Sequence, residues 1–303
     1  MKQFASDLKT QLAILPTVCI LMILSCTEDF NIKTDNSPPS VVIYGTLTNE
    51  TDYQYVQVSM SSPYFDTVPN TGISGATVRV TSSNNEIFMF QEIDTIPGTY
   101  RTVNKIAGIQ GEEYTLNVDI QLNGNVESYT AKSTMISPTP IDSIRLHNMR
   151  IVGRNLYALL LYAQDPPEEN FYLHRIKLND SLIYKKLSRV QIMSDLGING
   201  SYINGLQVRG FSHISEKEKE KENPDNSNAS ERIYLSPDDT ITFATGQIEK
   251  EYYNFISQCK QERNGENPFF GGPPSNIVTN LTNGAFGYFA CCAFSEEKKA
   301  IAK

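Results

Sequence analysis

The side chains that most often carry out catalysis are sparse in this sequence. The chain has three histidines, His147, His174 and His213, and no two of them stand at the spacing of metal ligands. A serine nucleophile motif, G-x-S-x-G, does not occur either, because TGISGAT lacks its final glycine. Catalysis needs a nucleophile with a base, a metal cluster or paired carboxylates in a cleft. We therefore expect a protein that is not an enzyme, with no metal and no catalytic residues.

Three carboxylates come closest to a catalytic group. Asp165, Glu168 and Glu169 lie within DPPEEN, and two of them in a cleft would imitate the acid and base of a hydrolase. The two prolines of this stretch instead favour a stiff turn between strands, so hydrolase activity is the lesser alternative. The charged run SEKEKEKENPDNSNAS lacks the glycine and spaced carboxylates of a calcium loop, and we expect it to be a solvated excursion.

Cys26 is the residue for which the sequence predicts a chemical reaction. An apolar run, LAILPTVCILMIL, precedes it, follows Lys2 and Lys9, and is shorter than the about 20 residues of a membrane span. The residues ILSC resemble a bacterial lipobox, in which the cysteine thiol receives a diacylglycerol and the preceding peptide is removed. We therefore expect a signal peptide over residues 1–25 and a Cys26 that carries diacylglycerol and a fatty acyl group such as palmitate. An A-x-A-like cleavage site is missing, and plain secretion or an uncleaved anchor are the alternatives.

Composition predicts a folded, water-soluble body behind this anchor. The chain has 303 residues, of which 40% are hydrophobic and 20% are charged, enough for one large or two ordinary domains. A formal net charge of -8 argues against nucleic acid as a partner, because phosphate backbones attract clustered Lys and Arg. The 16 Tyr and 14 Phe, with no Trp, favour strands over helices.

The elements that would position any site are mainly strands. After a flexible polar tether over residues 26–40, short apolar runs such as VVIYGTL, ATVRVTS and EYTLNVDIQL recur and are separated by turn residues. In ATVRVTS, Val78 and Val80 point to one face and the polar residues between them point to the other. The pattern predicts an antiparallel, immunoglobulin-like β-sandwich over residues 41–137.

Pro138 and Pro140 mark the expected domain boundary. Beyond them, β-rich runs such as NLYALLLYAQ and FYLHRIKL predict a second antiparallel β-sandwich-like domain over residues 138–303. One helix is expected late in this domain, in GQIEKEYYNFISQCKQERNG, because apolar residues recur there at helical spacing and Gly265 provides a stop. A long Gly- and Pro-rich loop follows the helix and leads into the last strand.

Three cysteines are expected to remain as thiols or as one bridge. Cys259, Cys291 and Cys292 are too few and too unevenly spaced for a disulfide framework. Buried free thiols are the favoured interpretation, and a single bridge from Cys259 to Cys291 or Cys292 is the alternative in an oxidising envelope.

A set of motifs in a fixed order resembles one protein family. The segment NPFFGGPPSNIVTNLTNGAFGYF is similar to the C-terminal signature of the Bacteroidota outer-membrane lipoprotein family known as domain of unknown function 4249. The lipobox cysteine, VVIYGTLTNE, VSMSSPYFD, ISGATVRV, YTLNV, LYAQDPPEENFYLHRI and DTITFATGQIEKEYYNFI extend the resemblance over nearly the whole mature chain. The segment ACCAF departs from it, because paired cysteines are unusual in the family's last strand.

The resemblance implies a location and a partner but no reaction. Members of the family resemble accessory lipoproteins encoded beside TonB-dependent outer-membrane receptors, which implies a role in the capture or import of a nutrient. Glu28 and Asp29 resemble the acidic signal that exports such lipoproteins to the cell surface, with a solvated acidic linker as the alternative. A structural or adhesive surface lipoprotein is the alternative function.

Aromatic residues on two loops are candidates for binding a partner. Tyr64 and Phe65 lie in SSPYFD, and Phe269 and Phe270 lie in NPFFGGPP. Exposed side chains of this kind present flat apolar surface to a receptor or a ligand. The alternative is that they pin their loops onto the sandwiches.

Overall fold

Alternating burial along the chain explains why it folds into strands. The computed structural model describes residues 39–61, 71–151, 154–184, 186–213, 233–264 and 277–302. In β1 (Val41–Thr48), β4 (Thr77–Ser82) and β7 (Glu113–Leu122), every second residue is buried. This period of two gives each strand one apolar face, which must pack against another layer.

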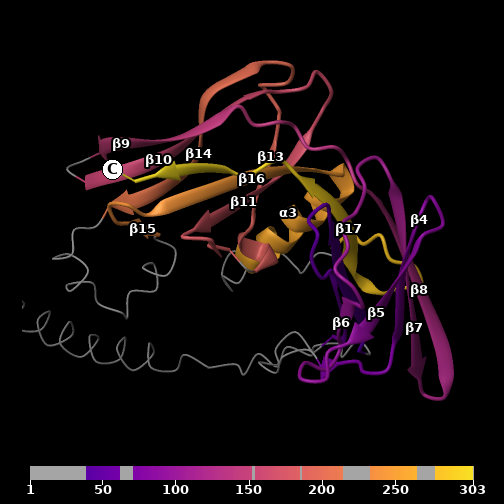
Figure 1. Cartoon of the computed structure of the whole chain (residues 1–303). Helices are drawn as coiled ribbons and strands as arrows, with labels where there is room; N and C mark the ends of the chain where they lie inside the picture. Colours follow the sequence, from indigo (N-terminus) through magenta and orange to yellow (C-terminus); the bar gives the residue numbers. More distant parts are fainter. Residues whose placement is uncertain are drawn as a thin grey trace, which may run out of the picture. The chain divides into compact units, whose positions relative to one another are not determined.

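Two sheets contain the strands that the described residues form (Figure 1). In the larger sheet the order is β12-β11-β16-β17-β1-β2-β6-β5-β4-β7-β8, and β13, β18 and β3 pair with β11, β16 and β2. The smaller sheet has the order β15-β14-β10-β9. The bounds of the other elements are β2 (Tyr55–Met60), β3 (Thr71–Gly72), β5 (Ile87–Glu92), β6 (Thr99–Thr102), β8 (Asn125–Thr134), β9 (Ser143–Ile151), β10 (Arg154–Gln164), β11 (Phe171–Leu178), β12 (Ser181–Leu182), η1 (Leu187–Arg189), β13 (Gln191–Ser194), β14 (Tyr202–His213), β15 (Tyr234–Leu235), β16 (Thr240–Ile248), α3 (Lys250–Asn264), β17 (Phe286–Phe294) and β18 (Lys298–Ile301).

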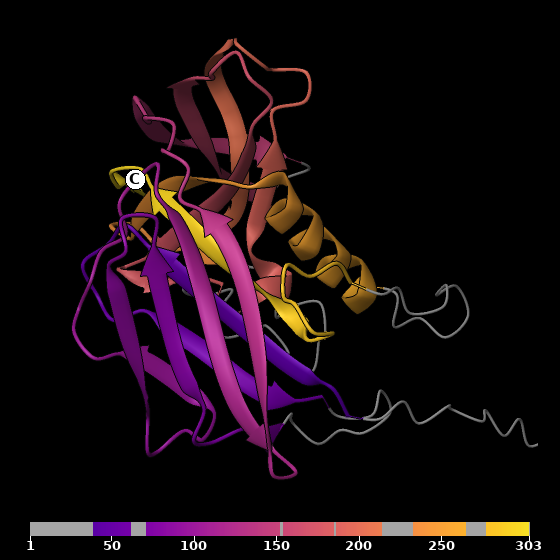
Figure 2. The same cartoon turned by 90° about the vertical axis from the view of Figure 1, so that its right-hand side faces the viewer.

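Strand β17, which lies late in the sequence, pairs with β1, the first strand of the described residues. The pairing is parallel, and Figure 2 shows this yellow strand beside the indigo and magenta strands of the N-terminal half. Its side chains alternate between two cores, with Phe289 and Cys291 in one and Tyr288 and Cys292 in the other. A parallel strand buried on both faces has a nearly continuous apolar sequence, which here is FGYFACCAF. The adjacent cysteines therefore point in opposite directions.

Three apolar clusters hold the layers together. The first fills the interior formed by the N-terminal strands and one face of β17. The second lies between the smaller sheet and the strands β11 and β16. The third lies on the opposite face of β16 and β17, where Tyr252, Phe255 and Ile256 of helix α3 are buried. Strands β16 and β17 therefore contribute to a core on each face.

The start of α3 is tied to the N-terminal half by hydrogen bonds. Glu249 accepts one bond from the hydroxyl of Ser133 (2.7 Å) and another from the backbone N–H of Thr134 (3.0 Å). The Ser133 hydroxyl also accepts a bond from the backbone N–H of Cys291, at 2.9 Å. These bonds fix the helix against β8 and β17.

The observed elements confirm a mainly β fold with one helix late in the described part of the chain. The expected boundary at Pro138 and Pro140 lies between β8 and β9, and the pairing of β17 with β1 crosses it. All described residues belong to one compact unit. The division into 41–137 and 138–303 therefore stays a prediction. Within the described residues, no helix is both long and apolar enough to cross a membrane.

Candidate functional site

A hollow of about 170 Å³ lies where β1 and the end of β17 meet β11 and the segment after it. Apolar and aromatic residues supply most of its wall, among them Tyr44, Leu173, Leu187, Val190, Tyr252 and Phe294. Thr46 and Thr48 add hydroxyl groups, and Arg175 adds a guanidinium. We call this hollow the Arg175 pocket. Its walls come from segments far apart in the sequence, which the pairing of β17 with β1 brings together.

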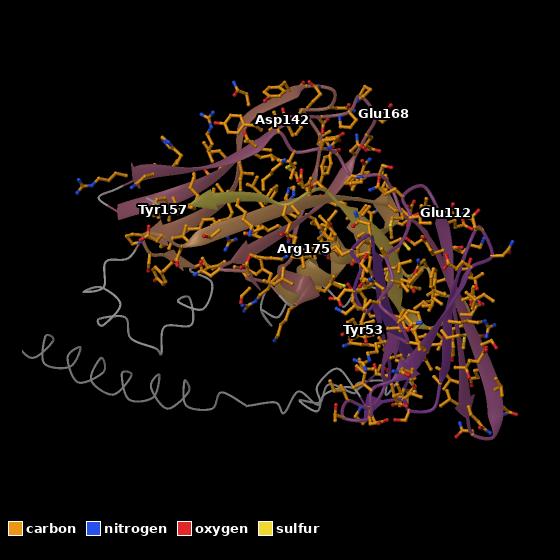
Figure 3. All side chains as sticks on the ribbon, in the orientation of Figure 1. Tyr53, Glu112, Asp142, Tyr157, Glu168 and Arg175 are labelled. Carbon is orange, nitrogen blue, oxygen red and sulfur yellow. The ribbon has the colours of Figure 1, made fainter. Side chains whose placement is uncertain are left out.

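Arg175 lies between the strands of the two halves of the chain (Figure 3). Its side chain is only 16% exposed, and one guanidinium nitrogen donates a hydrogen bond of 2.6 Å to Glu50. The guanidinium carbon lies 3.6 Å from the centre of the Phe294 ring, which is a cation–π contact. Alternation along β11 places the side chains of Arg175 and Leu173 on one face and the His174 ring against Phe243 on the other, although His174 also borders the pocket.

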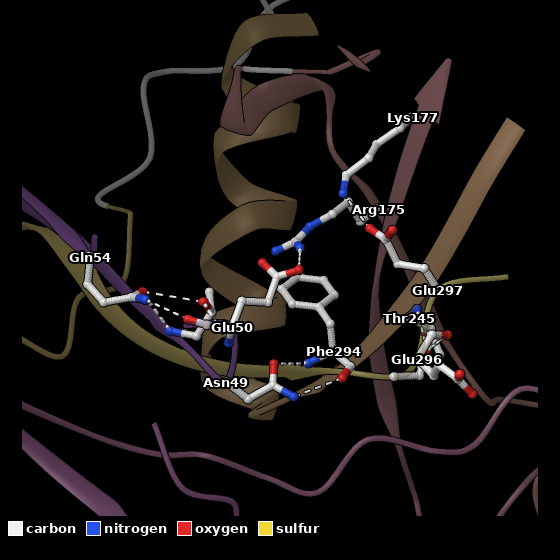
Figure 4. A network of polar contacts seen from close by, with 11 residues as sticks. Asn49, Glu50, Gln54, Arg175, Lys177, Thr245, Phe294, Glu296 and Glu297 are labelled. Carbon is white, nitrogen blue, oxygen red and sulfur yellow. Dashed lines mark hydrogen bonds and ion pairs between the residues drawn. The ribbon is translucent and has the colours of Figure 1, made fainter. Parts of the chain in front are cut away.

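Phe294 and Glu50 are held in place by two amide side chains (Figure 4). The Asn49 amide donates to the carbonyl of Phe294 and accepts from its backbone N–H, both at 2.9 Å, so it acts like a residue of a paired strand. Gln54 is buried and donates to the carbonyls of Glu50 (3.2 Å), Asp52 (3.1 Å) and Ile106 (3.1 Å). The side chain of Gln54 therefore fixes the backbone of the loop that carries Glu50.

Tyr44, Tyr252 and Cys292, which line the pocket, are uncharged at neutral pH. The hydroxyls of Tyr44 and Tyr252 are hydrogen-bonded to each other at 2.9 Å. Burial raises the pKa of Tyr44 to about 12 and raises the pKa of Tyr252 well above its ordinary value. Burial likewise raises the pKa of the Cys292 thiol to about 12. Among the described residues that line the pocket, Arg175 is thus the one that is charged at neutral pH.

A second hollow of about 680 Å³ adjoins the first, and Phe294 lines both. Its walls are more polar and include Asn49, Glu50, Glu296, Glu297 and Lys298. The charges here are paired, since Lys177 binds Glu297 and Lys298 binds Glu296. Glu50 reaches Arg175 from the side of this second hollow (Figure 4).

The histidines do not form a site together. His147 is exposed on β9, His213 ends β14, and His174 is buried on β11. The Nδ1 atom of His174 lies 3.1 Å from the Thr245 hydroxyl, and its Nε2 atom has no hydrogen-bond partner among the described residues. Burial lowers the pKa of His174 to about 4, so the ring is neutral at physiological pH.

The three carboxylates of DPPEEN are not brought together either. Asp165 is buried and accepts hydrogen bonds from the hydroxyl of Tyr172 (2.7 Å) and the backbone N–H of Gly200 (3.0 Å). Glu168 and Glu169 are exposed, Glu169 pairs with Lys250, and Glu168 lies at the periphery in Figure 3. The stretch is a turn between β10 and β11. In the part of the chain that the structure describes, no three His, Cys, Asp or Glu residues are grouped to hold a metal ion.

The cysteines of the folded unit form no disulfide with one another. Cys291 and Cys292 are buried thiols on opposite faces of β17, as the favoured interpretation of the sequence predicted, whereas Cys259 is only partly buried. The other candidate residues, Cys26, Glu28, Asp29, Tyr64, Phe65, Phe269 and Phe270, lie outside the described residues.

Sequence reasoning missed Arg175, Glu50, Tyr44 and Phe294 as a site. A signal was present in FYLHRIKL, where the strand face that begins with Phe171 and Leu173 continues with Arg175, a charge that is rarely buried without a partner. No local pattern indicates which residue provides that partner, because Glu50 lies far away in the sequence.

The described fold is β-rich and contains a small, mostly apolar cavity. The chain matches the family described as domain of unknown function DUF4249 over residues 27–298, and it belongs to that family. The sequence motifs predicted this membership. No curated protein matches the chain.

One solved structure with some similarity is that of a DUF4785 family protein from Legionella pneumophila. The identity is 10% and the TM-score is 0.24, over 68% of this chain and 51% of the other. The chain thus spans about half the length of that protein.

Proposed function

We propose that this protein is a non-enzymatic lipoprotein of the outer membrane that faces the cell exterior and captures a ligand for a TonB-dependent nutrient uptake system, or acts as a partner subunit of it. The observation that carries the proposal is the Arg175 pocket. It is concave, mostly apolar and has a few convergent polar groups, which is the usual composition of a small-molecule site.

The anchor in this proposal is Cys26 with its diacylglycerol and fatty acyl groups. Two or three acyl chains hold a protein stably on a bilayer, whereas a single chain holds it only marginally. Glu28 and Asp29 provide the signal for export to the surface. The tether over residues 26–40 then separates the binding unit from the lipid.

The proposed architecture has two consecutive sandwiches, the first of the immunoglobulin type. Alternating strands from Val41 onward support this, as do separate apolar clusters in the N-terminal strands and between the smaller sheet and β11 and β16. In this arrangement the Arg175 pocket lies at the joint of the two sandwiches, a place where ligand sites often form.

The aromatic loops provide the proposed contact with the receptor. Replacing Phe269 and Phe270 with Ala should leave the thermal unfolding of the protein unchanged and abolish its association with the receptor. Loss of folding would show instead that the two rings belong to the core, and the contact would have to be sought elsewhere.

The test is an affinity purification of the tagged full-length protein from solubilised membranes of its own host, followed by mass spectrometry. We expect a TonB-dependent receptor in stoichiometric amount. Recovery of the lipoprotein alone would refute a stable uptake complex and favour a structural or adhesive role.

A further inference from the structure

We infer that the Arg175 pocket binds a small organic carboxylate with an aryl or short aliphatic tail, and that Glu50, which lines the second hollow, competes with the ligand's carboxylate for the Arg175 guanidinium. The inference rests on the proposed function, since it names the class of ligand that the capture site would take.

The size and lining of the pocket determine which ligand tails can fit. The residues that line the volume of about 170 Å³ include Leu173, Leu187, Val190, Tyr44 and Tyr252. An apolar cavity of about 150 Å³ accommodates one benzene ring and stays dry when it is empty. A single ring or a short chain therefore fits, and a charged or strongly hydrated tail would lose its water without compensation.

The Arg175 guanidinium determines which head group the ligand should have. Arginine has five N–H donors in a planar fork that matches both oxygens of a carboxylate. Among the described residues, Arg175 has one hydrogen bond, the contact of 2.6 Å with Glu50. Stacking on Phe294 fixes the plane of the guanidinium, so donors that Glu50 leaves unused keep a defined direction.

Glu50 is placed to compete with the ligand for the Arg175 guanidinium, which it contacts from the side of the second hollow. Its side chain is 44% exposed, whereas that of Arg175 is 16% exposed, so the glutamate can turn into water while the arginine stays. The buried Gln54 holds the backbone of Glu50, so only the side chain has to move. An ion pair with one exposed partner is weak, and its competition should reduce ligand affinity by about two- to fivefold.

The experiment measures ¹⁹F relaxation of 4-fluorobenzoate and 6,6,6-trifluorohexanoate with the full-length protein in lipid nanodiscs, and empty nanodiscs serve as the blank. The neutral analogue 4-fluorobenzamide has the same ring without the charge. We expect at least one acid to bind, and 4-fluorobenzamide to bind at least tenfold more weakly than 4-fluorobenzoate. If neither acid binds, or if the amide binds as well as the acid, the inference is wrong.

Four variants assign the effect to residues. Arg175→Gln should abolish binding of the acid, and Glu50→Gln should strengthen it about two- to fivefold. Arg79→Gln is the matched control, because Arg79 pairs with Asp119 on another part of the surface. If Arg175→Gln fails to fold, Leu182→Trp provides the test, because Leu182 is exposed beside the pocket and a larger ring there should block entry. Unchanged or weaker binding by Glu50→Gln would overturn the role of Glu50.

The two proposals can fail separately. Copurification of a receptor without binding of either acid would leave the uptake role intact and refute the ligand class. Binding of an acid without any receptor would refute the uptake role and leave the ligand class intact.

Discussion

His174 should make the stability of this protein fall as the pH drops below about 6.5. Its ring is buried against Phe243, with a centroid distance of 5.3 Å, and is stacked on Tyr172 at 6.5 Å. Burial lowers its pKa to about 4 in the folded state, whereas the unfolded chain has the ordinary value of 6.5. The unfolded chain therefore takes up a proton first as the pH falls. The stabilisation is complete above pH 6.5 and is lost as the pH falls toward 4.

The size of the effect follows from the two pKa values. At 1.36 kcal/mol for each pKa unit, the difference between 6.5 and about 4 corresponds to about 3 kcal/mol when fully developed. Because protonation is linked to unfolding, about 2 kcal/mol of the free energy of unfolding should be lost between pH 7.5 and pH 5. A loss of that size is a large share of the stability of an ordinary domain.

The assay is denaturant unfolding of the wild type and two variants at pH 7.5, 6 and 5. His174→Phe retains an apolar ring but cannot be protonated, so its free energy of unfolding should vary less with pH, by about 2 kcal/mol across this range. His147→Phe makes the same change at an exposed histidine and should follow the wild type. Equal pH dependence in the wild type and His174→Phe would refute the reasoning.

Three further predictions concern Gln54, the two buried thiols of β17 and Cys26. Gln54→Ala should lower the free energy of unfolding by about 2–3 kcal/mol, measured by denaturant titration, because the buried amide is lost and three partly buried carbonyls lose their donor; a neutral effect would contradict the network. Cys291 and Cys292 should resist iodoacetamide at pH 8 until the protein unfolds, because burial raises the pKa of both thiols, and mass spectrometry would detect any reaction in the folded state. Cys26→Ala should abolish incorporation of labelled palmitate and release the protein from the membrane fraction; retention of both would exclude acylation at this position.

Local patterns in the sequence predict the elements of this fold well. The period of two in the N-terminal runs corresponds to β1, β4 and β7, and the helical spacing from Tyr252 to Cys259 corresponds to α3, whereas Ile248, where that pattern begins, ends β16. DPPEEN is a turn, as its prolines indicated. These features depend on neighbours within a few residues, which is why a single sequence reveals them.

The parallel pairing of β17 with β1 could not be predicted in this way. The hydrogen bonds of a parallel ladder are made by the backbone, so the sequence of a strand does not indicate which strand it pairs with. The apolar run FGYFACCAF indicated a buried strand, but a run of this length fits burial in several sheets. The Arg175 pocket depends on this pairing, because Tyr44 and Phe294 reach it from the two paired strands.

The pairing also explains why an arginine is tolerated at the pocket. Placing Arg175 in an apolar wall would be costly without a partner, and Glu50 and the Phe294 ring provide one charged and one aromatic contact. Both contacts depend on Asn49, whose amide fixes the end of β17 next to the residue that carries the carboxylate. A loss of the Asn49 amide would therefore move both contacts at once. The position of the Arg175 guanidinium therefore depends on the contacts where β1 and β17 meet, and not on β11 alone.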